Sequence, residues 1–377
     1  MPFIHAFITP NTISPCCAYT KPIKLNSKLK YWKSDQLKNI QKNMFNDVRD
    51  GGCKICWDKE DRGYSSLRNH SNQIYKDHID KFKINDQPFY LDLRLGNLCN
   101  LKCRMCVSEW SSQIASEIID NPNEDWLDTP TQKIIELDDD SWKLLDQWLP
   151  YVKRVFMTGG EPTIIQRNLD YINKIIKSGR SSEVELIFTT NATNINKKFM
   201  NKAKSFKSVS FNVSIDAIGD LANYIRYPSN WKTIEKNLKN IKKGLSLNTT
   251  IQWLNMTRLD EIFDFIEKSN IQFSGIWFQL VTDPKYLDPI YAPTFMKQKC
   301  IQDIDNFLKK PFLNQKKFND ILTGELKQSL QQVKNFLTKN LHNVKYTKEF
   351  LKRMEILDRL RKQKLLDVLP EFKQIGG

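Results

Sequence analysis

Apolar and polar residues alternate along residues 89–95, where the chain reads Phe-Tyr-Leu-Asp-Leu-Arg-Leu. This alternation places the four large apolar side chains on one face, a pattern that predicts a β-strand. The Gly-Asn pair at 96–97 then allows the backbone to turn. A loop is therefore expected to begin at the carboxyl end of this strand.

Strand patterns continue to alternate with helical patterns from residue 86 to 285. The predicted strands are 90–95, 154–158, 184–189, 209–215, 249–254 and 275–280, and the helical patterns between them include 168–177, 231–243 and 259–268. Strands that alternate with helices form a parallel sheet, so six such units predict an α/β fold with a partial (βα)6 parallel barrel. Parallel barrels place their functional side chains on the loops after the carboxyl ends of the strands.

Two further regions flank this core. Residues 1–85 contain a predicted strand at 3–8, a return at 13–17 and a helix that Ser34 can cap. Residues 286–377 follow a Pro-rich linker and contain helical patterns at 301–309, 325–338 and 348–364. The sequence thus predicts a small N-terminal cysteine-rich module, a core at 86–285 and a helical C-terminal region.

The cysteines fall into groups along the 377 residues. Seven of the eight lie in three tight groups, and Cys300 stands alone as an expected structural thiol. No apolar run approaches the length of a membrane span, and the N-terminus lacks the basic segment and apolar stretch of a secretory signal. We therefore expect a cytoplasmic protein without a membrane segment, in which grouped cysteines bind metal rather than form disulfides.

The densest group is Cys99-x3-Cys103-x2-Cys106, directly after the first core strand. Three thiolates on one short loop can hold a cubane iron–sulfur cluster and leave its fourth iron without a protein ligand. That open iron can bind a substrate or a cofactor. The alternatives are three buried cysteines or part of a zinc site, although zinc usually takes four ligands in paired spacing.

This cysteine motif resembles the signature of the radical S-adenosylmethionine (radical SAM) family, in which an apolar or aromatic residue precedes the last cysteine, here Met105. The family's Gly-Gly-Glu-Pro motif is matched in full after the second predicted strand. The resemblance implies that Gly159, Gly160 and Glu161 hold the amino group of S-adenosylmethionine (SAM). Taken alone, paired glycines followed by a carboxylate are more often an ordinary turn.

Polar residues also follow the third and fourth predicted strands. Asn191, Ser214 and Asp216 resemble family positions near the ribose and the methionyl part of SAM, and Arg226 resembles the arginine that pairs with its carboxylate. A guanidinium suits that role because it binds a carboxylate through two parallel hydrogen bonds. Each of these residues can instead be a capping or surface residue. Gln252 and Gln279, on the last two strands, are further candidates that can also pair within the sheet.

The N-terminal module holds the other two cysteine groups, Cys16-Cys17 and Cys53-x2-Cys56. Brought together by a hairpin and a helix, these pairs can bind zinc or an iron–sulfur cluster, and the spacing does not choose between them. The stretch resembles the twitch-type auxiliary-cluster module of some radical SAM enzymes. Its fourth ligand stays open: the second of the adjacent pair, Cys300, a non-cysteine group, or none.

The resemblance implies an enzyme with a [4Fe–4S] cluster that cleaves SAM reductively, so that a 5′-deoxyadenosyl radical abstracts hydrogen from a substrate. It also implies a flavodoxin- or ferredoxin-like reductant and a substrate that is a peptide or a small molecule. One alternative is a non-catalytic iron–sulfur protein for electron transfer or sensing, which has no need of a loop for the SAM amine. Another is a zinc-containing nucleic-acid-binding protein.

The charge balance bears on that last alternative. The net charge is +15, from 58 basic and 43 acidic residues, and the part from residue 297 onward contributes 18 basic and 9 acidic residues. A basic helical tail can bind nucleic acid. However, no arginine patch interleaved with aromatic residues accompanies it, and dispersed lysines usually cover a solvated face. The composition permits nucleic-acid binding without supporting it.

Overall fold

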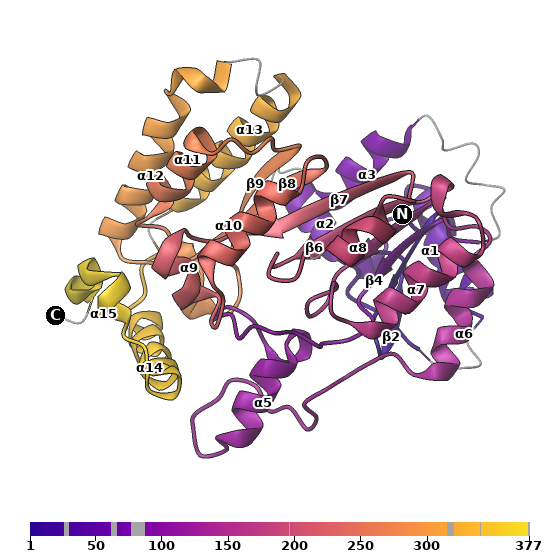
Figure 1. Ribbon diagram of the computed structural model, residues 1–377, viewed down its shortest axis with the longest axis horizontal. Coiled ribbons are helices and arrows are strands. Elements are labelled where there is room, and N and C mark those ends of the chain that lie inside the picture. Colours follow the sequence, from indigo (N-terminus) through magenta and orange to yellow (C-terminus); the bar gives the residue numbers. More distant parts are fainter. Residues whose placement is uncertain are drawn as a thin grey trace. The chain divides into compact units, whose positions relative to one another are not determined.

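The computed structural model shows a mixed α/β protein (Figure 1) and describes residues 1–25, 30–61, 66–76, 87–195, 197–314, 320–339 and 341–375. Its strands are β1 (His5–Ile8), β2 (Thr12–Ser14), β3 (Ile23–Lys24), β4 (Tyr90–Leu93), β5 (Arg154–Met157), β6 (Glu185–Thr190), β7 (Ser208–Ser214), β8 (Leu245–Ile251) and β9 (Gly275–Leu280). The six strands β4 to β9 occupy the region where strand–helix alternation is predicted. The expected boundary at residue 85 lies outside the described residues.

The strands form one sheet in the order β3-β2-β1-β4-β5-β6-β7-β8-β9. The first two neighbouring pairs, β3–β2 and β2–β1, are antiparallel, whereas β1–β4, β4–β5, β5–β6, β7–β8 and β8–β9 are parallel. The sheet is therefore mostly parallel, as strand–helix alternation predicts. Its curvature into a partial barrel stays a prediction.

One predicted strand is misplaced. The pattern at 249–254 suggests a strand there, but β8 ends at Ile251. The cause is a local turn, because the backbone N–H of Gln252 donates to the side chain of Asn255 (2.8 Å) and the N–H groups of Asn255 and Met256 donate to the Gln252 carbonyl. Buried apolar residues continue through this turn as Trp253 and Leu254, which explains why periodicity alone extends the strand.

The helices are α1 (Asp35–Phe45), α2 (Lys54–Glu60), α3 (Leu67–Tyr75), α5 (Ser112–Asp120), α6 (Asp139–Trp148), α7 (Gln166–Lys177), α8 (Lys197–Ala203), α9 (Gly219–Ile225), α10 (Trp231–Asn240), α11 (Leu259–Lys268), α12 (Thr294–Leu308), α13 (Asp320–Leu337), α14 (Val344–Arg361) and α15 (Leu365–Val368). The residues group into two compact units. Unit 1 comprises 1–98, 134–188 and 197–209, and unit 2 comprises 99–133, 189–196 and 210–377. These units do not follow the domain boundaries predicted from the sequence, which stay predictions.

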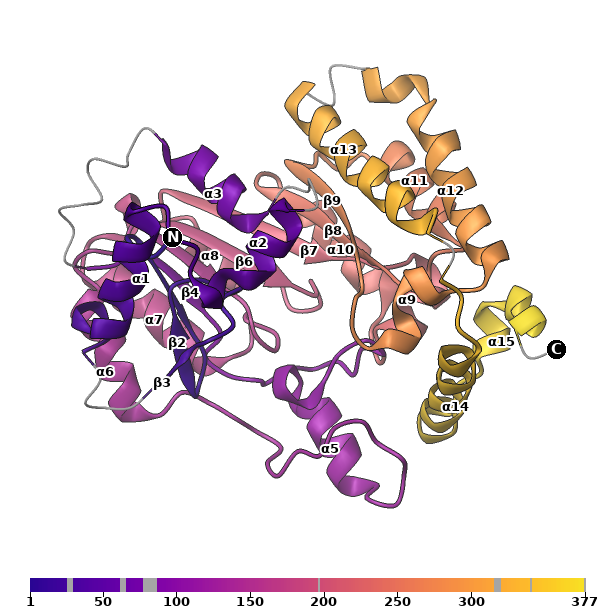
Figure 2. The same cartoon turned by 180° about the vertical axis from the view of Figure 1, so that it is seen from behind.

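Unit 1 contains the N-terminal strands and the helices α1, α2, α3, α6, α7 and α8 (Figure 2). The side chain of Ser34 accepts from the backbone N–H of Leu37 and so caps α1, as the sequence predicts. Strand β1 lies parallel to β4, with His5 opposite Tyr90. The N-terminal segment therefore extends the central sheet of this unit.

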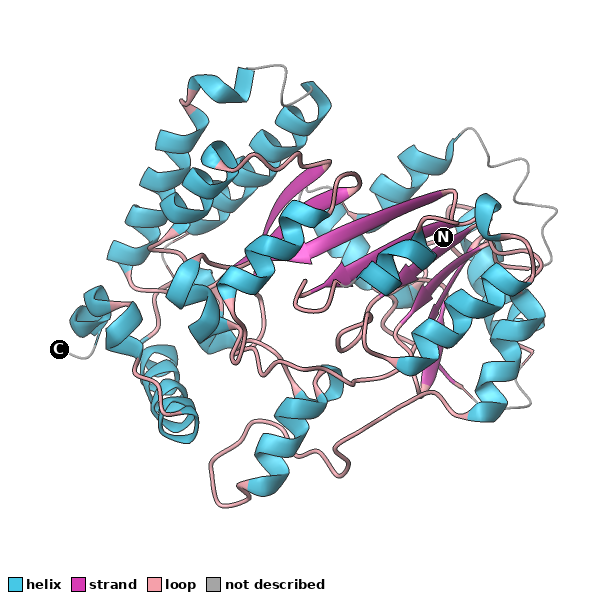
Figure 3. Cartoon of the chain, viewed as in Figure 1, coloured by secondary structure: helices cyan, strands magenta, loops and turns pink. Residues whose placement is uncertain are grey.

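Unit 2 contains most of β7 together with β8, β9, α5 and the helices from α9 onward (Figure 3). Helix α13 packs on β9, and α12 packs on α11. The rings of Phe263 on α11 and Phe307 on α12 stack with centroids 4.1 Å apart. Near the C-terminus, Phe350 of α14 packs against Trp253 and Phe372, which fixes α14 to the core of this unit. None of the described helices is both long and apolar enough to cross a membrane.

Candidate functional site

The three closely spaced cysteines lie on the loop between β4 and α5, within unit 2. Cys99, Cys103 and Cys106 are half-buried reduced thiols, and the backbone N–H of Cys106 donates to the Cys103 carbonyl (3.0 Å). Burial raises the pKa of Cys106 to about 12, and the charges of Cys103 and Cys99 add to this effect. The thiols are thus close enough to influence one another's ionisation, and a bound metal would be needed to keep them as thiolates.

Backbone hydrogen bonds hold this loop in place. The N–H groups of Lys102 and Arg104 donate to the carbonyls of Tyr227 and Ile225, at the end of α9. On the other side, Ser111 Oγ donates to the Leu101 carbonyl (2.7 Å), and the Cys99 N–H donates to Ser112 Oγ (3.2 Å). Ser111 also caps α5, so the loop is fixed between two helices of the same unit.

Arg226 and Asp216 lie beside the cysteine loop. Arg226 Nη2 is 2.6 Å from Asp216 Oδ2, and Arg226 Nη1 is 3.8 Å from Cys103 Sγ. Although burial opposes the charge, Asp216 and the Cys103 thiol keep the pKa of Arg226 above its ordinary value. Asp216 Oδ1 accepts from the backbone N–H of Thr250 (2.9 Å). The structure thus brings together two residues that the sequence assigns to SAM and one that it assigns to the cluster.

The other predicted polar residues of unit 2 occupy strand ends. Asn191 follows β6, and its Nδ2 donates to Oδ1 of Asn100 (3.0 Å), the residue after Cys99. Asn100 in turn donates to Thr193 Oγ1 (2.8 Å). Ser214 is the last residue of β7 and is half-buried, as is Met105 within the cysteine loop. The amide of Asn191 is therefore linked to the start of that loop through Asn100.

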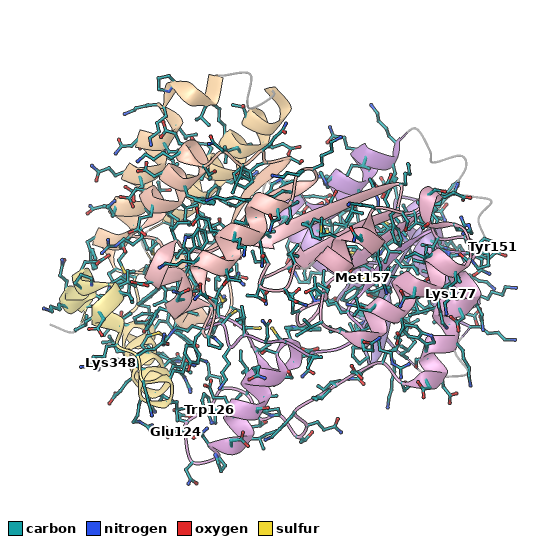
Figure 4. The ribbon with its side chains drawn as sticks, in the orientation of Figure 1. Glu124, Trp126, Tyr151, Met157, Lys177 and Lys348 are labelled. Atoms are coloured by element: carbon teal, nitrogen blue, oxygen red, sulfur yellow. The ribbon has the colours of Figure 1, made fainter. Side chains whose placement is uncertain are left out.

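The Gly-Gly-Glu-Pro loop belongs to unit 1 and follows Met157, the last residue of β5, which is labelled in Figure 4. Its backbone lies directly against residues 96–98: a Cβ on Gly160 would lie 2.2 Å from the Leu98 carbonyl oxygen. Gly159 has φ +115, which L side chains rarely adopt. The Glu161 N–H donates to the Leu98 carbonyl (2.8 Å). Glycine is therefore required at both positions for the loop backbone to pack against Leu98, the residue that precedes Cys99.

The Glu161 side chain is buried. Its Oε1 accepts hydrogen bonds from the backbone N–H (3.2 Å) and the hydroxyl (2.6 Å) of Thr163. Two hydrogen bonds from Thr163, a residue of the same loop, therefore orient this carboxylate.

Residues 93–266 match the family model described as the Radical SAM superfamily. This part of the chain therefore matches a radical SAM domain. The match begins at the last residue of β4, runs through both motifs and ends in α11. No match to a curated protein was found.

Several solved structures are similar to the chain at low sequence identity. Native anSMEcpe with bound AdoMet has a TM-score of 0.43 and 17% identity, over 60% of this chain and 62% of that chain. SuiB of Streptococcus suis bound to its precursor peptide SuiA has a TM-score of 0.38 and 17% identity, over 76% of this chain and 64% of that chain. This chain thus spans less than two thirds of the length of these structures.

The sequence did not indicate the contact of the cysteine loop with α14, whereas it did name Gln252 and Gln279 as candidates. Arg104, inside the cysteine loop, contacts α14, which lies about 250 residues later in the sequence and gives no local signal of that contact. Gln252 is fully buried, and neither amide atom has a hydrogen-bond partner among the described residues. Its position directly after β8 is the signal for a ligand contact, whereas exposed Gln279 pairs with Thr250 in the sheet (3.4 Å).

The N-terminal cysteine pairs lie in unit 1, on loops that are tied together. Cys16 and Cys17 follow β2, Cys53 and Cys56 lie at the start of α2, and the Thr20 N–H donates to the Gly52 carbonyl (2.9 Å). A hydrogen bond from Cys17 lowers the pKa of the Cys16 thiol. Burial, with Asp50 and Cys56, raises the pKa of Cys53 to about 11.

In neither cysteine group do the described side chains surround a position for a metal ion. Across the described residues, no three His, Cys, Asp or Glu side chains are arranged as ligands of one metal ion. The donor sets nevertheless suit the expected groups, since soft thiolates favour iron–sulfur clusters and zinc. The backbone of the cysteine loop is held by hydrogen bonds to Tyr227, Ile225 and Ser111.

Proposed function

We propose that this chain is a radical SAM enzyme that binds a [4Fe–4S] cluster through Cys99, Cys103 and Cys106 and cleaves SAM reductively to abstract hydrogen from a substrate. The observation that carries this proposal is the 2.8 Å hydrogen bond from the Glu161 N–H to the Leu98 carbonyl. It joins the Gly-Gly-Glu-Pro loop to the residue directly before Cys99. Within unit 1, the Gly-Gly-Glu-Pro loop is thereby attached to the segment that leads into the cysteine motif, and the family match over 93–266 includes both motifs.

The residues around the cysteine loop suit a negatively charged cluster. Arg226 places a positive charge 3.8 Å from Cys103 Sγ, which favours the thiolate over the thiol. Asp216 fixes the guanidinium and partly balances its charge. Cys99, Cys103 and Cys106 would hold this cluster, which would supply the electron for the reductive cleavage of SAM. The protein's task is to position both groups and keep water out.

The binding of SAM follows from the same residues. Glu161 offers a buried carboxylate to the amino group, and the Gly159–Gly160 backbone permits close approach. We assign Asn191 and Ser214 to the ribose side, supported by their positions at the ends of β6 and β7. Arg226 is assigned to the SAM carboxylate, which would share the guanidinium with Asp216. Met105 and Asp216 complete the proposed set.

The partners of this reaction are part of the proposal. A flavodoxin- or ferredoxin-like protein would deliver the electron, because single-electron carriers of low potential are the usual reductants of such clusters. The substrate is a peptide or a small molecule. One of the similar structures is SuiB bound to its precursor peptide SuiA, but this observation concerns SuiB and does not identify the substrate of this chain.

Anaerobic purification of the full chain tests the proposal. We expect a brown protein that forms 5′-deoxyadenosine from SAM under dithionite, and a Cys99/Cys103/Cys106 triple-alanine variant that does not. Cys300→Ala is the control, because this buried thiol lies in α12, outside the loop. Undiminished turnover in the triple variant would refute the assignment. Iron and sulfide without SAM cleavage would favour an electron-transfer protein, and zinc alone a zinc protein.

A second metal site is proposed in the N-terminal module, formed by Cys53 and Cys56 with one or both of Cys16 and Cys17. The support is that these loops are joined by the Thr20–Gly52 hydrogen bond and that their thiols perturb one another's pKa values. A site with three protein thiolates leaves an open iron, whereas four thiolates close it.

The triple-alanine variant also tests this second site. Residual iron and sulfide at about one cluster per chain would support an auxiliary cluster. Zinc in its place would make the module a zinc knuckle. If neither metal is retained, the four thiols are reduced structural cysteines.

A further inference from the structure

A cavity of about 370 Å³ lies in unit 2 and includes two of the three cluster cysteines, Cys103 and Cys106, in its lining. Helices α5 and α14 form much of its wall, and the segments 126–128 and 283–286 complete it. Trp126 and Glu124, labelled in Figure 4, lie beyond the end of α5 next to α14, and Arg359 of α14 donates to Glu124 (2.6 Å). The volume falls within the range of small-molecule sites.

Arg353 of α14 lines this cavity and is 7% exposed. Its Nε and Nη1 are buried and have no hydrogen-bond partner within the described part of the chain. The remaining nitrogen, Nη2, is 3.7 Å from Asp125 Oδ2, beyond hydrogen-bonding distance, and Lys352 already occupies that carboxylate at 2.7 Å. Arg353 is therefore a buried cation whose donors are almost entirely unused.

The other two arginines of the cavity differ in this respect. Arg361 donates through Nε and Nη2 to the two carboxylate oxygens of Glu117 (3.1 and 2.7 Å). Arg104 Nη2 donates to Asp358 (2.6 Å). Because a buried charge without a partner is strongly unfavourable, the Arg353 guanidinium is the position where a ligand would gain most by supplying a negative charge.

We infer that this cavity binds a carboxylate of the substrate and that Arg353 is the residue that anchors it, an inference that rests on the proposed function. A guanidinium presents a planar set of donors that matches a carboxylate. The apolar side chains of Ile114, Ile118 and Leu357 in the wall suit the carbon skeleton of the same molecule. Since Cys103 and Cys106 line the cavity too, the anchored molecule lies at the proposed cluster.

The charges of the wall favour a single negative charge on the ligand. Arg104 and Arg361 donate hydrogen bonds to carboxylates, whereas Arg353 has only the longer contact with Asp125 (3.7 Å), so its guanidinium keeps most of its donors for a ligand. Glu109, Asp128 and Asp283 also line the cavity. Glu109 and Asp283 are exposed, so solvent screens them more than it screens Arg353, whereas Asp128 is half-buried and accepts a hydrogen bond from the Ser108 N–H (2.8 Å). Their presence disfavours a doubly charged phosphate, and a carboxylate is therefore the better match.

Isothermal titration of the anaerobically reconstituted full chain tests this site with three probes of similar shape: benzoate, benzamide and phenyl phosphate. We expect benzoate to bind more tightly than the other two. Arg353→Met should weaken benzoate binding about tenfold or more, the loss of a charge-assisted hydrogen bond. Arg353→Lys should recover part of it, because it keeps the charge without the planar donors. Arg359→Met, which removes an exposed arginine of the same helix, should not change it.

The outcomes separate this inference from the proposed function. Benzoate binding that is equal in the wild type and Arg353→Met, with both folded by thermal unfolding, overturns the site, as does tighter binding of phenyl phosphate. If Arg353→Met weakens SAM binding as much as benzoate binding, the guanidinium belongs to SAM and the substrate assignment is wrong. If the wild type does not cleave SAM but benzoate binding still depends on Arg353, the proposed function fails and a carboxylate site remains.

Discussion

Arg104, which lies between Cys103 and Met105, donates to Asp358 of α14 across 2.6 Å. The arginine side chain is fully buried, and its guanidinium carbon lies 3.6 Å from the centroid of the Tyr224 ring. The Tyr224 hydroxyl donates to the same Asp358 oxygen (2.8 Å). The cysteine loop is therefore attached to the C-terminal helix through one carboxylate within unit 2.

The first prediction is that Asp358→Ala destabilises the protein and loosens the cluster loop. Removing one partner of a buried ion pair typically costs about 3–5 kcal/mol, because the other charge stays buried. We expect a lower midpoint of thermal unfolding and less iron after reconstitution. Asp367→Ala, at an exposed position of α15, is the control. Equal iron content and stability in the two variants would show that Asp358 does not support the loop.

The second prediction concerns Gly160. An alanine Cβ there would lie 2.2 Å from the Leu98 carbonyl oxygen, a backbone atom that can move only with the main chain before Cys99. We expect Gly160→Ala to lower both the unfolding temperature and the iron content measured after reconstitution.

Gly324→Ala is the matched control for this substitution. Gly324 lies in α13, and no heavy atom of the described residues lies within 4 Å of its added Cβ. Alanine in a helix should stabilise the protein by up to about 1 kcal/mol. If both alanine variants behave alike, the close approach of the Gly-Gly-Glu-Pro loop to Leu98 has no structural importance.

The Gly-Gly-Glu-Pro loop could be predicted from the sequence, whereas the contact between Arg104 and Asp358 could not. The alternation at 89–95 and the glycines at 159–160 are local signals, so they predict β4 and a loop of close approach. The Arg104–Asp358 pair joins residues 254 apart, and nothing in the spacing of either residue announces it. The sequence therefore predicts a helical C-terminal region, but not that its helix α14 contacts the cysteine loop.

A similar distinction applies to strand pairing. The pattern at 3–8 predicts a strand, but its parallel pairing with β4 depends on which sheet edge is available, and a single sequence does not encode that choice. The position of these polar residues along the chain was predictable, since Asn191 directly follows β6, Ser214 is the last residue of β7 and Asp216 comes shortly after it. The partners of those residues were not, because Asn100 and Arg226 reach them only through the fold.

The third prediction concerns the pH dependence of stability. His5 Nε2 and Asp92 Oδ2 are 3.9 Å apart, but burial lowers the pKa of His5 to about 3 and raises the pKa of Asp92 to about 8. Both side chains are therefore mainly uncharged at neutral pH. The folded chain keeps the Asp92 proton to about pH 8, whereas the unfolded chain releases it near pH 4.

The contribution of Asp92 to the free energy of unfolding must therefore fall as pH rises from about 4 to about 8, by at most about 1.4 kcal/mol per pH unit. Asp92→Asn removes this loss, so its stability advantage over the wild type should grow with pH across that window. Chemical denaturation of both proteins at pH 5, 6, 7 and 8, in roughly even steps through this range, measures the difference between their free energies of unfolding. Asp220→Asn, an exposed aspartate, should show no such trend. A constant difference at all four pH values would mean that Asp92 is ionised in the folded protein.

The last prediction concerns the half-buried Arg226 and the buried Asp216, which are 2.6 Å apart beside Cys103. Arg226→Met and Asp216→Asn should each destabilise the chain by about 3–5 kcal/mol, because each leaves the other charge without its partner. The double variant should lose less than the sum of the two by at least about 1 kcal/mol. Denaturation of the four proteins gives this coupling energy. The same cycle on the surface pair Lys239–Glu235, also 2.6 Å apart, should give less than about 0.5 kcal/mol, since solvent screens it. Additive losses at Arg226 and Asp216 would mean that the pair does not act as one charged unit, and Arg226 would then be available to a ligand without displacing its interaction with Asp216.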